Sequence, residues 1–224
     1  MTDKLTKKEL KEPDILQVTF WKLVDYLTKN RKRVIIISAI VAMHIIGGLA
    51  WFIYNDRYEK DAQEKYRQAY DFDLKGGVRG SDHAIKGYVD LTDIYPRSRA
   101  TKLAYYRLGG LYFQQGKHEQ SIAAYERFLK SATIDPVLQS LANSGLGYAH
   151  EARKDYPKAV AAFEKAAETT PGDRLAAINY RNLARIYEQM GDVPKSLDYY
   201  KKALQKAKDP SQELFLKRKI AELG

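Results

Sequence analysis

The longest uninterrupted apolar stretch of the chain runs from Val34 to Tyr54, and its 21 residues carry no formal charge. A helix of that length extends about 31 Å, close to the roughly 30 Å hydrocarbon core of a bilayer. A helix satisfies its own backbone hydrogen bonds in lipid, which a lone strand cannot do. We therefore predict a transmembrane helix over residues 34–54. The alternative is a buried core helix, although such helices are usually shorter.

The residues before this stretch predict one short amphipathic helix. Apolar side chains recur from Ile15 to Leu27, with Lys22 and Asp25 off the apolar face. Trp21 is a residue type that favours the headgroup level of a membrane. The helix would lie on a membrane surface, or it would pack on the surface of a partner protein.

Basic residues gather on the N-terminal side of the apolar stretch. Those that lie directly against it are Lys29, Arg31, Lys32 and Arg33. Lysine and arginine mark the cytoplasmic end of a transmembrane helix, and the charges just after Tyr54 nearly cancel. We therefore expect residues 1–33 to be a cytoplasmic tail and residues 55–224 to lie across the membrane. Trp51 and Tyr54 would mark the second interface as aromatic side chains.

The apolar stretch also has one feature of a cleaved signal peptide. Gly48-Leu49-Ala50 is a small-x-small sequence of the kind that a signal peptidase accepts. However, 33 residues precede the stretch, whereas a cleaved signal has a short charged head. The apolar run also continues beyond this sequence. We therefore favour an uncleaved signal-anchor helix.

The rest of the chain repeats one pattern of apolar, small and aromatic positions. Each complete unit has a leucine followed by glycine or alanine, then a small residue twelve positions later and an aromatic four positions beyond it. The leucine pairs are Leu108-Gly109, Leu146-Gly147 and Leu183-Ala184, followed by Ser121 and Tyr125, Ala159 and Phe163, and Ser196 and Tyr200. Such a unit is two antiparallel helices, and the units bury their apolar faces by stacking.

This repetition predicts an all-α chain in which the anchor helix is followed by an α-solenoid of helix pairs. The expected units are about 60–97, 100–136, 138–171 and 175–209, with a capping helix over 210–224. The first helix of the first unit would run on from the transmembrane segment and break at Lys75-Gly76-Gly77. Two complete units have a loop glycine, Gly116 and Gly191, and Lys154 replaces it in the middle unit.

The repeated positions resemble the tetratricopeptide repeat, whose pattern is W-x2-L-G-x2-Y, then A-x3-F, then P. Tyr105-x2-Leu108-Gly109-x2-Tyr112 fits the first part, and Tyr180-x2-Leu183-Ala184-x2-Tyr187 nearly does. The middle unit departs from it, with Asn143 and His150 at the aromatic positions, and the period exceeds the family's 34 residues. The resemblance implies a superhelix that binds other proteins in a groove lined by the first helices.

No set of residues in the sequence predicts catalysis. The chain has no cysteine, which excludes disulfides, thiolate metal sites and a cysteine nucleophile, and its four histidines are scattered. His118 and His150 occupy the family's tyrosine positions and are expected to be packing residues. The net charge of +10 is spread out without a basic run interleaved with aromatics, so we expect no nucleic-acid partner. We therefore expect that the protein is not an enzyme and that it has no cofactor, metal site or small-molecule substrate.

The resemblance also places candidate protein-binding residues on the first helices of the complete units. These groove residues are Tyr106, Phe113, Tyr148, Arg181, Arg185 and Glu188, with Leu103, Leu141, Ser144 and Ile178 at further inward positions. An aromatic floor with two arginines suits an extended peptide or an unfolded segment. The family's co-chaperone type clamps a carboxylate with lysine and asparagine, and Tyr106 and Gly110 do not supply that clamp. The alternative is that Tyr106 and Tyr148 cover the edge of the core.

A short tail, one span and a tetratricopeptide domain form a layout that resembles the YfgM-type ancillary subunits of the bacterial Sec translocon. The resemblance implies a single-pass protein of the bacterial inner membrane, with its N-terminus in the cytoplasm and its repeat domain in the periplasm. The partners it implies are translocon subunits, a periplasmic chaperone and secreted chains. The alternative function is a scaffold for an envelope-assembly or cell-division complex that uses the same groove.

Overall fold

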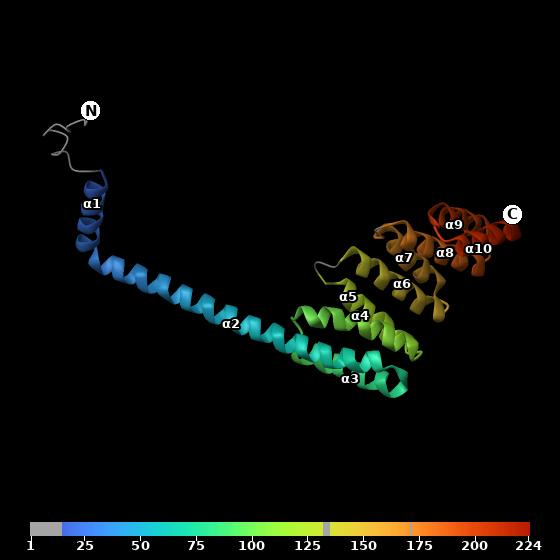
Figure 1. Ribbon diagram of the computed structural model, residues 1–224, viewed down its shortest axis with the longest axis horizontal. Coiled ribbons are helices and arrows are strands. Elements are labelled where there is room, and N and C mark those ends of the chain that lie inside the picture. Colours follow the sequence, from blue (N-terminus) through green and yellow to red (C-terminus); the bar gives the residue numbers. More distant parts are fainter. Residues whose placement is uncertain (1–14, 132–134, 171) are drawn as a thin grey trace, which may run out of the picture. The chain divides into compact units, whose positions relative to one another are not determined.

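The structure, a computed structural model, describes residues 15–131, 135–170 and 172–224, and this part of the chain contains α-helices and no strand (Figure 1). The helices are α1 (Ile15–Lys29), α2 (Arg31–Lys75), α3 (Gly77–Ile94), α4 (Arg99–Gln114), α5 (His118–Leu129), α6 (Pro136–Ala152), α7 (Tyr156–Glu168), α8 (Asp173–Gln189), α9 (Val193–Lys206) and α10 (Pro210–Leu223). The chain divides into two compact units, one up to Arg57 and one from Tyr58 onward.

The N-terminal unit consists of α1 and the first part of α2. The predicted segment 34–54 lies inside α2, which continues as one helix to Lys75. Among the described residues, α2 is the helix that is long and apolar enough to cross a membrane, judged by its length and composition. None of its apolar window is buried within the structure. The large apolar side chains of this unit are exposed, Trp21 and Trp51 among them.

In the C-terminal unit, the second part of α2 packs against α3. Ala62 and Ala69 of α2 and Tyr88 of α3 are buried in one apolar cluster. Between the two helices, Gly76 and Gly77 have positive φ angles of 65° and 71°, a conformation that glycine adopts without a steric penalty. The glycine break in the sequence therefore lets the chain turn back, so that α3 can cover α2.

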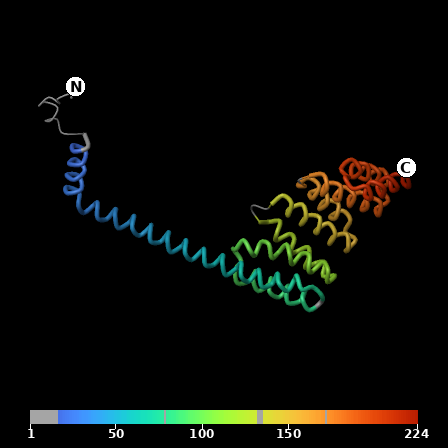
Figure 2. Tube along the Cα trace, viewed as in Figure 1, coloured from blue at the N-terminus to red at the C-terminus, as the bar shows by residue number. Residues whose placement is uncertain are grey.

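The following helices pair in chain order, α4 with α5, α6 with α7 and α8 with α9, and α10 packs against α9 (Figure 2). The repeated small positions are all fully buried: Ala84, Ser121, Ala159 and Ser196. The repeated aromatic positions are buried as well: Tyr88, Tyr125, Phe163 and Tyr200. The predicted all-α solenoid of helix pairs is confirmed.

The glycine of each repeated leucine–glycine pair makes room for the aromatic of the second helix. A Cβ atom at Gly109 would lie 2.7 Å from the ring of Tyr125, and one at Gly147 would lie 2.7 Å from the ring of Phe163. Protein interiors are close-packed, so neither position can take a larger residue unless the ring moves. The spacing of glycine and aromatic along the sequence is therefore a packing requirement of these two helix pairs.

The tight turns inside the three complete pairs each place one residue in the left-handed region. Gly116 and Gly191 have φ angles of 72° and 77°, and Lys154 occupies the same place in the middle pair with a φ of 61°. A side chain disfavours this conformation, because its Cβ approaches the following carbonyl oxygen. The middle turn therefore keeps the backbone geometry of its neighbours with a strained residue.

Candidate protein-binding groove

The first helices of the three complete pairs, and α10 after them, present apolar side chains at one repeated register position. Leu103 of α4, Leu141 of α6, Ile178 of α8 and Phe215 of α10 follow one another at steps of 38, 37 and 37 residues. None of them is fully buried, and Leu103 and Phe215 are 39% and 44% exposed. We call these four residues the inner row. Accessible apolar residues that recur along a stack are a candidate recognition surface.

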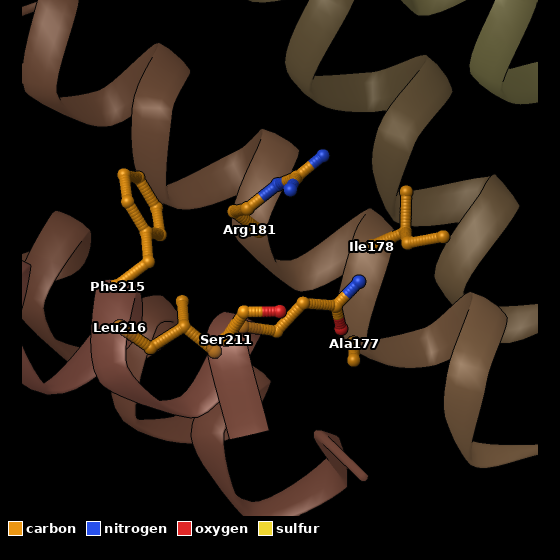
Figure 3. A pocket seen from close by; sticks show the side chains of 7 residues that line it. Ala177, Ile178, Arg181, Ser211, Phe215 and Leu216 are labelled. Carbon is orange, nitrogen blue, oxygen red and sulfur yellow. The ribbon is translucent and has the colours of Figure 1, made fainter. Parts of the chain in front are cut away.

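One hollow, with a volume of about 250 Å³, lies between α8 and α10 and is referred to as the α8–α10 hollow (Figure 3). It is lined by Ala177, Ile178, Arg181, Ser211, Gln212, Phe215 and Leu216. Ala177 and Leu216 are buried, whereas Arg181 and Phe215 are accessible. Within the described residues, the side chain of Arg181 has neither an ion pair nor a hydrogen bond. The hollow therefore combines an apolar surface with an unpaired guanidinium group.

A second hollow, with a volume of about 470 Å³, lies between α4, the end of α5 and the start of α6 and is referred to as the α4–α6 hollow. It is lined by Arg99, Lys102, Leu103, Phe128, Ser131, Asp135 and Leu138. The Asp135 carboxylate accepts hydrogen bonds from the backbone nitrogens of Val137 and Leu138 and so caps α6. This hollow again joins apolar side chains to two cations, Arg99 and Lys102.

Three of the predicted groove residues are aromatic, and each contacts another ring of its own helix pair. Tyr106 packs against Phe128 with 5.4 Å between ring centroids, and burial raises the pKa of its hydroxyl. Phe113 lies 5.5 Å from the ring of His118. Tyr148 meets Phe163 edge to face at 5.1 Å. These contacts tie the aromatic floor to the interior of the stack.

The Tyr148 hydroxyl and the Arg185 guanidinium also join neighbouring helix pairs. The Tyr148 oxygen accepts a hydrogen bond of 2.8 Å from Nδ2 of Asn182 on α8. Arg185 of α8 donates to both carboxylate oxygens of Glu151 on α6, with 2.7 Å between Nη2 and Oε2. The hydrogen bond with Glu151 raises the pKa of Arg185. Both predicted groove residues therefore have an internal role in stacking one pair on the next.

Glu188, the last predicted groove residue, is likewise engaged within the fold. Its carboxylate accepts hydrogen bonds from the Tyr200 hydroxyl at 2.8 Å and from Nζ of Lys219 at 2.9 Å. The hydrogen bond from Lys219 holds the pKa of Glu188 below its usual value. Of the three charged residues predicted for the groove, Arg181 is therefore the one that faces an open hollow without a partner among the described residues.

Sequence reasoning did not select the groove residues contributed by α10 or by the start of α4. Phe215 was assigned only to a capping helix, and Arg99 and Lys102 precede the part of α4 that carries the leucine–glycine motif. Phe215 could have been found by its register, because it lies 37 residues after Ile178. No pattern in the sequence marked the two cations.

The described residues contain no group of three or more histidine, cysteine, aspartate or glutamate side chains that could hold a metal ion. His150 is buried, and its Nδ1 lies 3.8 Å from the Asp155 carboxylate. Burial lowers the pKa of His150 and favours the neutral ring. These observations agree with a packing role for this side chain.

The arrangement of helix pairs is similar to that of known repeat proteins. The solved structures with a similar fold include a MamA RS-1 ArsTM double mutant (TM-score 0.56, 16% identity), which aligns over 66% of this chain and 76% of its own. Another is a structure of MamA (TM-score 0.51, 19% identity), covering 64% and 88%. MamA 41-end from Desulfovibrio magneticus RS-1 gives a TM-score of 0.55 at 16% identity, covering 66% and 76%. At these identities the similarity shows the fold alone.

Family models identify the repeats themselves. Two models of the tetratricopeptide repeat match residues 103–134 and 138–209. A comparison with curated protein sequences returned no match. Tetratricopeptide repeats are a protein-interaction fold rather than a catalytic one. The chain therefore carries tetratricopeptide repeats that form a protein–protein interaction module.

Proposed function

We propose that this protein is a membrane-anchored binding module that presents its tetratricopeptide stack to protein partners on the far side of a membrane. The observation that carries the proposal is the presence, in one chain, of an unburied apolar segment in α2 and a repeat stack with two open hollows. Lipid supplies the apolar surroundings that the 34–54 segment lacks within the chain. The hollows supply places for side chains of a partner.

The flanks of the apolar segment support an orientation with the N-terminus in the cytoplasm. Lys29 and Arg33 stand on its N-terminal side, where the positive-inside rule places the cytoplasm. Phe20 and Trp21 of α1 are exposed, as expected of a helix that embeds its apolar face in the interface beside this basic cluster. The repeat stack from Tyr58 onward is then translocated.

The finer proposal is an accessory role at the secretion translocon of the bacterial inner membrane. It rests on the layout shared with the YfgM-type ancillary subunits: a short tail, one span and a tetratricopeptide domain in the periplasm. The partners are then translocon subunits, a periplasmic chaperone or chains in transit, which offer extended segments to the hollows. The second candidate is a scaffold for an envelope-assembly or cell-division complex, favoured by the same groove.

Site-specific photo-crosslinking in living cells tests this proposal. A photoreactive residue replaces Phe215 in the α8–α10 hollow, and a matched control replaces Lys201, an exposed residue of α9. We expect crosslinks from position 215 to translocon subunits and to chains undergoing secretion, and fewer from position 201.

The identity and position of the crosslinked proteins separate the alternatives. A fixed set of envelope-assembly or division proteins at position 215 would support the scaffold and exclude the translocon role. Crosslinks that arise only from positions within residues 15–57 would move recognition to the N-terminal unit and contradict a binding role for the repeats.

A further inference from the structure

The cations at the two hollows differ from Arg185, the other predicted groove arginine, because they lack an acidic partner among the described residues. Arg185 is matched by Glu151, which takes up both ends of its guanidinium group. In the part of the chain that the structure describes, the side chains of Arg99, Lys102 and Arg181 have no ion pair. Their positive charge is therefore available to a ligand.

The linings of the hollows contain little negative charge to oppose these cations. Among the described residues, Asp135 is the one acidic residue in the two linings, and its carboxylate accepts hydrogen bonds from the backbone nitrogens at the start of α6. Apolar side chains beside the cations lower the local dielectric and strengthen their attraction for an anion. The two hollows thus favour negative charge next to apolar groups.

We propose that the face of the stack that carries the inner row binds an extended segment in which apolar side chains alternate with aspartate or glutamate. An apolar side chain of the ligand enters each hollow, against Leu103 and Phe128 at one and against Ile178 and Phe215 at the other. A neighbouring carboxylate meets Arg99 and Lys102 at the first hollow and Arg181 at the second. A guanidinium group binds a carboxylate in a bidentate manner, which fixes the register of the segment.

An extended ligand is required by how the binding positions are distributed. The α4–α6 hollow belongs to the first complete pair, and the α8–α10 hollow lies beyond the third, with Leu141 of the inner row between them. Side chains several residues apart on one extended chain can reach such separated positions, as in other modes of peptide recognition. The proposal rests on the proposed function and adds the chemistry of the segment that is bound.

Direct binding of short labelled peptides to the purified full-length chain in detergent tests the proposal. Three peptides share alternating leucine and phenylalanine and differ in the intervening residues, which are glutamate, glutamine or lysine. Fluorescence anisotropy should show the glutamate peptide binding at least about tenfold more tightly than the glutamine peptide, and the lysine peptide binding most weakly. Added salt should weaken the binding of the glutamate peptide selectively.

Charge-removing variants locate the site. Arg181→Gln should weaken binding of the glutamate peptide by at least about tenfold, because arginine contacts are frequent hot spots. Arg181→Lys should recover part of the lost affinity. Lys201→Gln is the matched control, since it removes the same charge from an exposed position on α9 that lines neither hollow. Circular dichroism melting of each variant checks that the fold is retained.

The outcomes distinguish this proposal from the function on which it rests. Equal affinity for the glutamate and lysine peptides would overturn the acidic preference, while crosslinks from position 215 would still support a binding role. An unchanged affinity of Arg181→Gln together with a loss in Lys201→Gln would place the anion site elsewhere and overturn the proposal. Failure of all three peptides to bind would overturn it as well, and the crosslinking experiment would then decide the broader function alone.

Discussion

Lys154 is the residue at which the sequence of this stack conflicts most plainly with its backbone. Its φ of 61° matches the 72° and 77° of Gly116 and Gly191 in the equivalent turns. The two helices impose the geometry of the turn that joins them, because the Asp155 backbone nitrogen donates a hydrogen bond to the His150 carbonyl oxygen across it. The repeat therefore dictates the left-handed backbone conformation at this position, and this conformation is sterically unfavourable for lysine.

Replacing Lys154 by glycine should therefore stabilise the protein. Glycine removes the steric cost of the left-handed conformation, about 1 kcal/mol, although part of the gain is offset by the greater entropy of glycine in the unfolded chain. Urea denaturation should show a higher midpoint for Lys154→Gly. The converse change, Gly191→Lys, should lower the midpoint by a similar amount. A lower midpoint for Lys154→Gly would show that its side chain makes a compensating contact.

Tyr148 and Arg185 show where inference from the sequence ends at the scale of single residues. The repeat register correctly predicted the buried small and aromatic positions, because packing recurs at a fixed spacing. It could not show that Arg185 is matched by Glu151 or that Tyr148 is bonded to Asn182, since these partners lie 34 residues away on the neighbouring unit. A search for complementary groups one repeat apart is the signal that would have found them.

The double variant Tyr148→Ala with Arg185→Ala should therefore reduce stability as well as any binding. It removes an aromatic contact with Phe163 and leaves Glu151, whose side chain is 16% exposed, without its cation. Together these losses should cost about 3 kcal/mol or more. Thermal melting followed by circular dichroism measures the effect, with Lys158→Ala and Lys201→Ala as the surface control. A native-like melting curve would show that neither side chain is needed for the fold, and both would again be candidates for binding alone.

Among the elements, α2 combines two roles that the sequence separates only in part. The uncharged stretch predicted a helix over 34–54, the glycine break predicted the end of α2, and the repeat spacing predicted a first unit only from about residue 60. The structure places that start at Tyr58, whose ring lies 5.1 Å from the ring of Tyr95, and Ala62 follows as a fully buried residue. Small residues at helical spacing in a charged region are a weak pattern, because alanine is also a common surface residue of helices.

The orientation of α2 in a membrane can be tested with a topology reporter. A reporter that is active only outside the cytoplasm, fused after Gly224, should be active, because Lys29, Arg31 and Arg33 keep the N-terminal flank of the helix in the cytoplasm. Replacing the basic flank by glutamine should lower this activity, and the same number of lysine changes on α9 should not. Inactivity in a well-expressed fusion would contradict the orientation. A mature protein beginning near Trp51 would instead indicate cleavage.

Beside the apolar contacts of Leu216, one acidic residue, Glu188, links α8 to α10, and this link should respond to pH. Lys219 and Tyr200 donate to Glu188, and the first of these hydrogen bonds lowers the pKa of its carboxyl group. Because the pKa of Glu188 is lower in the folded state, ionisation of its carboxyl group stabilises the fold above the unfolded-state pKa of about 4.5. This stabilisation is lost as the pH falls through the folded-state pKa. Glu188→Gln should therefore melt below the native protein at pH near 7, with a smaller difference at acidic pH. Glu213→Gln, which removes an exposed partner of Lys217, is the control.

At the scale of the whole molecule, the repeat stack begins within the same helix that carries the apolar segment. Contacts divide the chain at Arg57 and Tyr58, inside α2 rather than at its end. Residues from Tyr58 to Lys75 therefore belong to the stack, where Tyr66 packs against Tyr88 with 5.4 Å between ring centroids. A solenoid unit is stabilised mainly by its neighbours, so this part of α2 acts as the N-terminal cover of the stack.

Two fragments separate a covering role of α2 from that of a simple connector. A fragment of residues 58–224 should be soluble without detergent, helical and cooperative in its thermal unfolding, because it keeps the complete stack. A fragment of residues 77–224 exposes Tyr88 and Ala84 of α3, and the lost burial of about 3 kcal/mol or more should lower its melting midpoint by about 6–12 °C. Restoring the cover with a separate peptide of residues 58–75 should recover part of the difference. Equal midpoints for the two fragments would mean that the second half of α2 only connects the span to the stack.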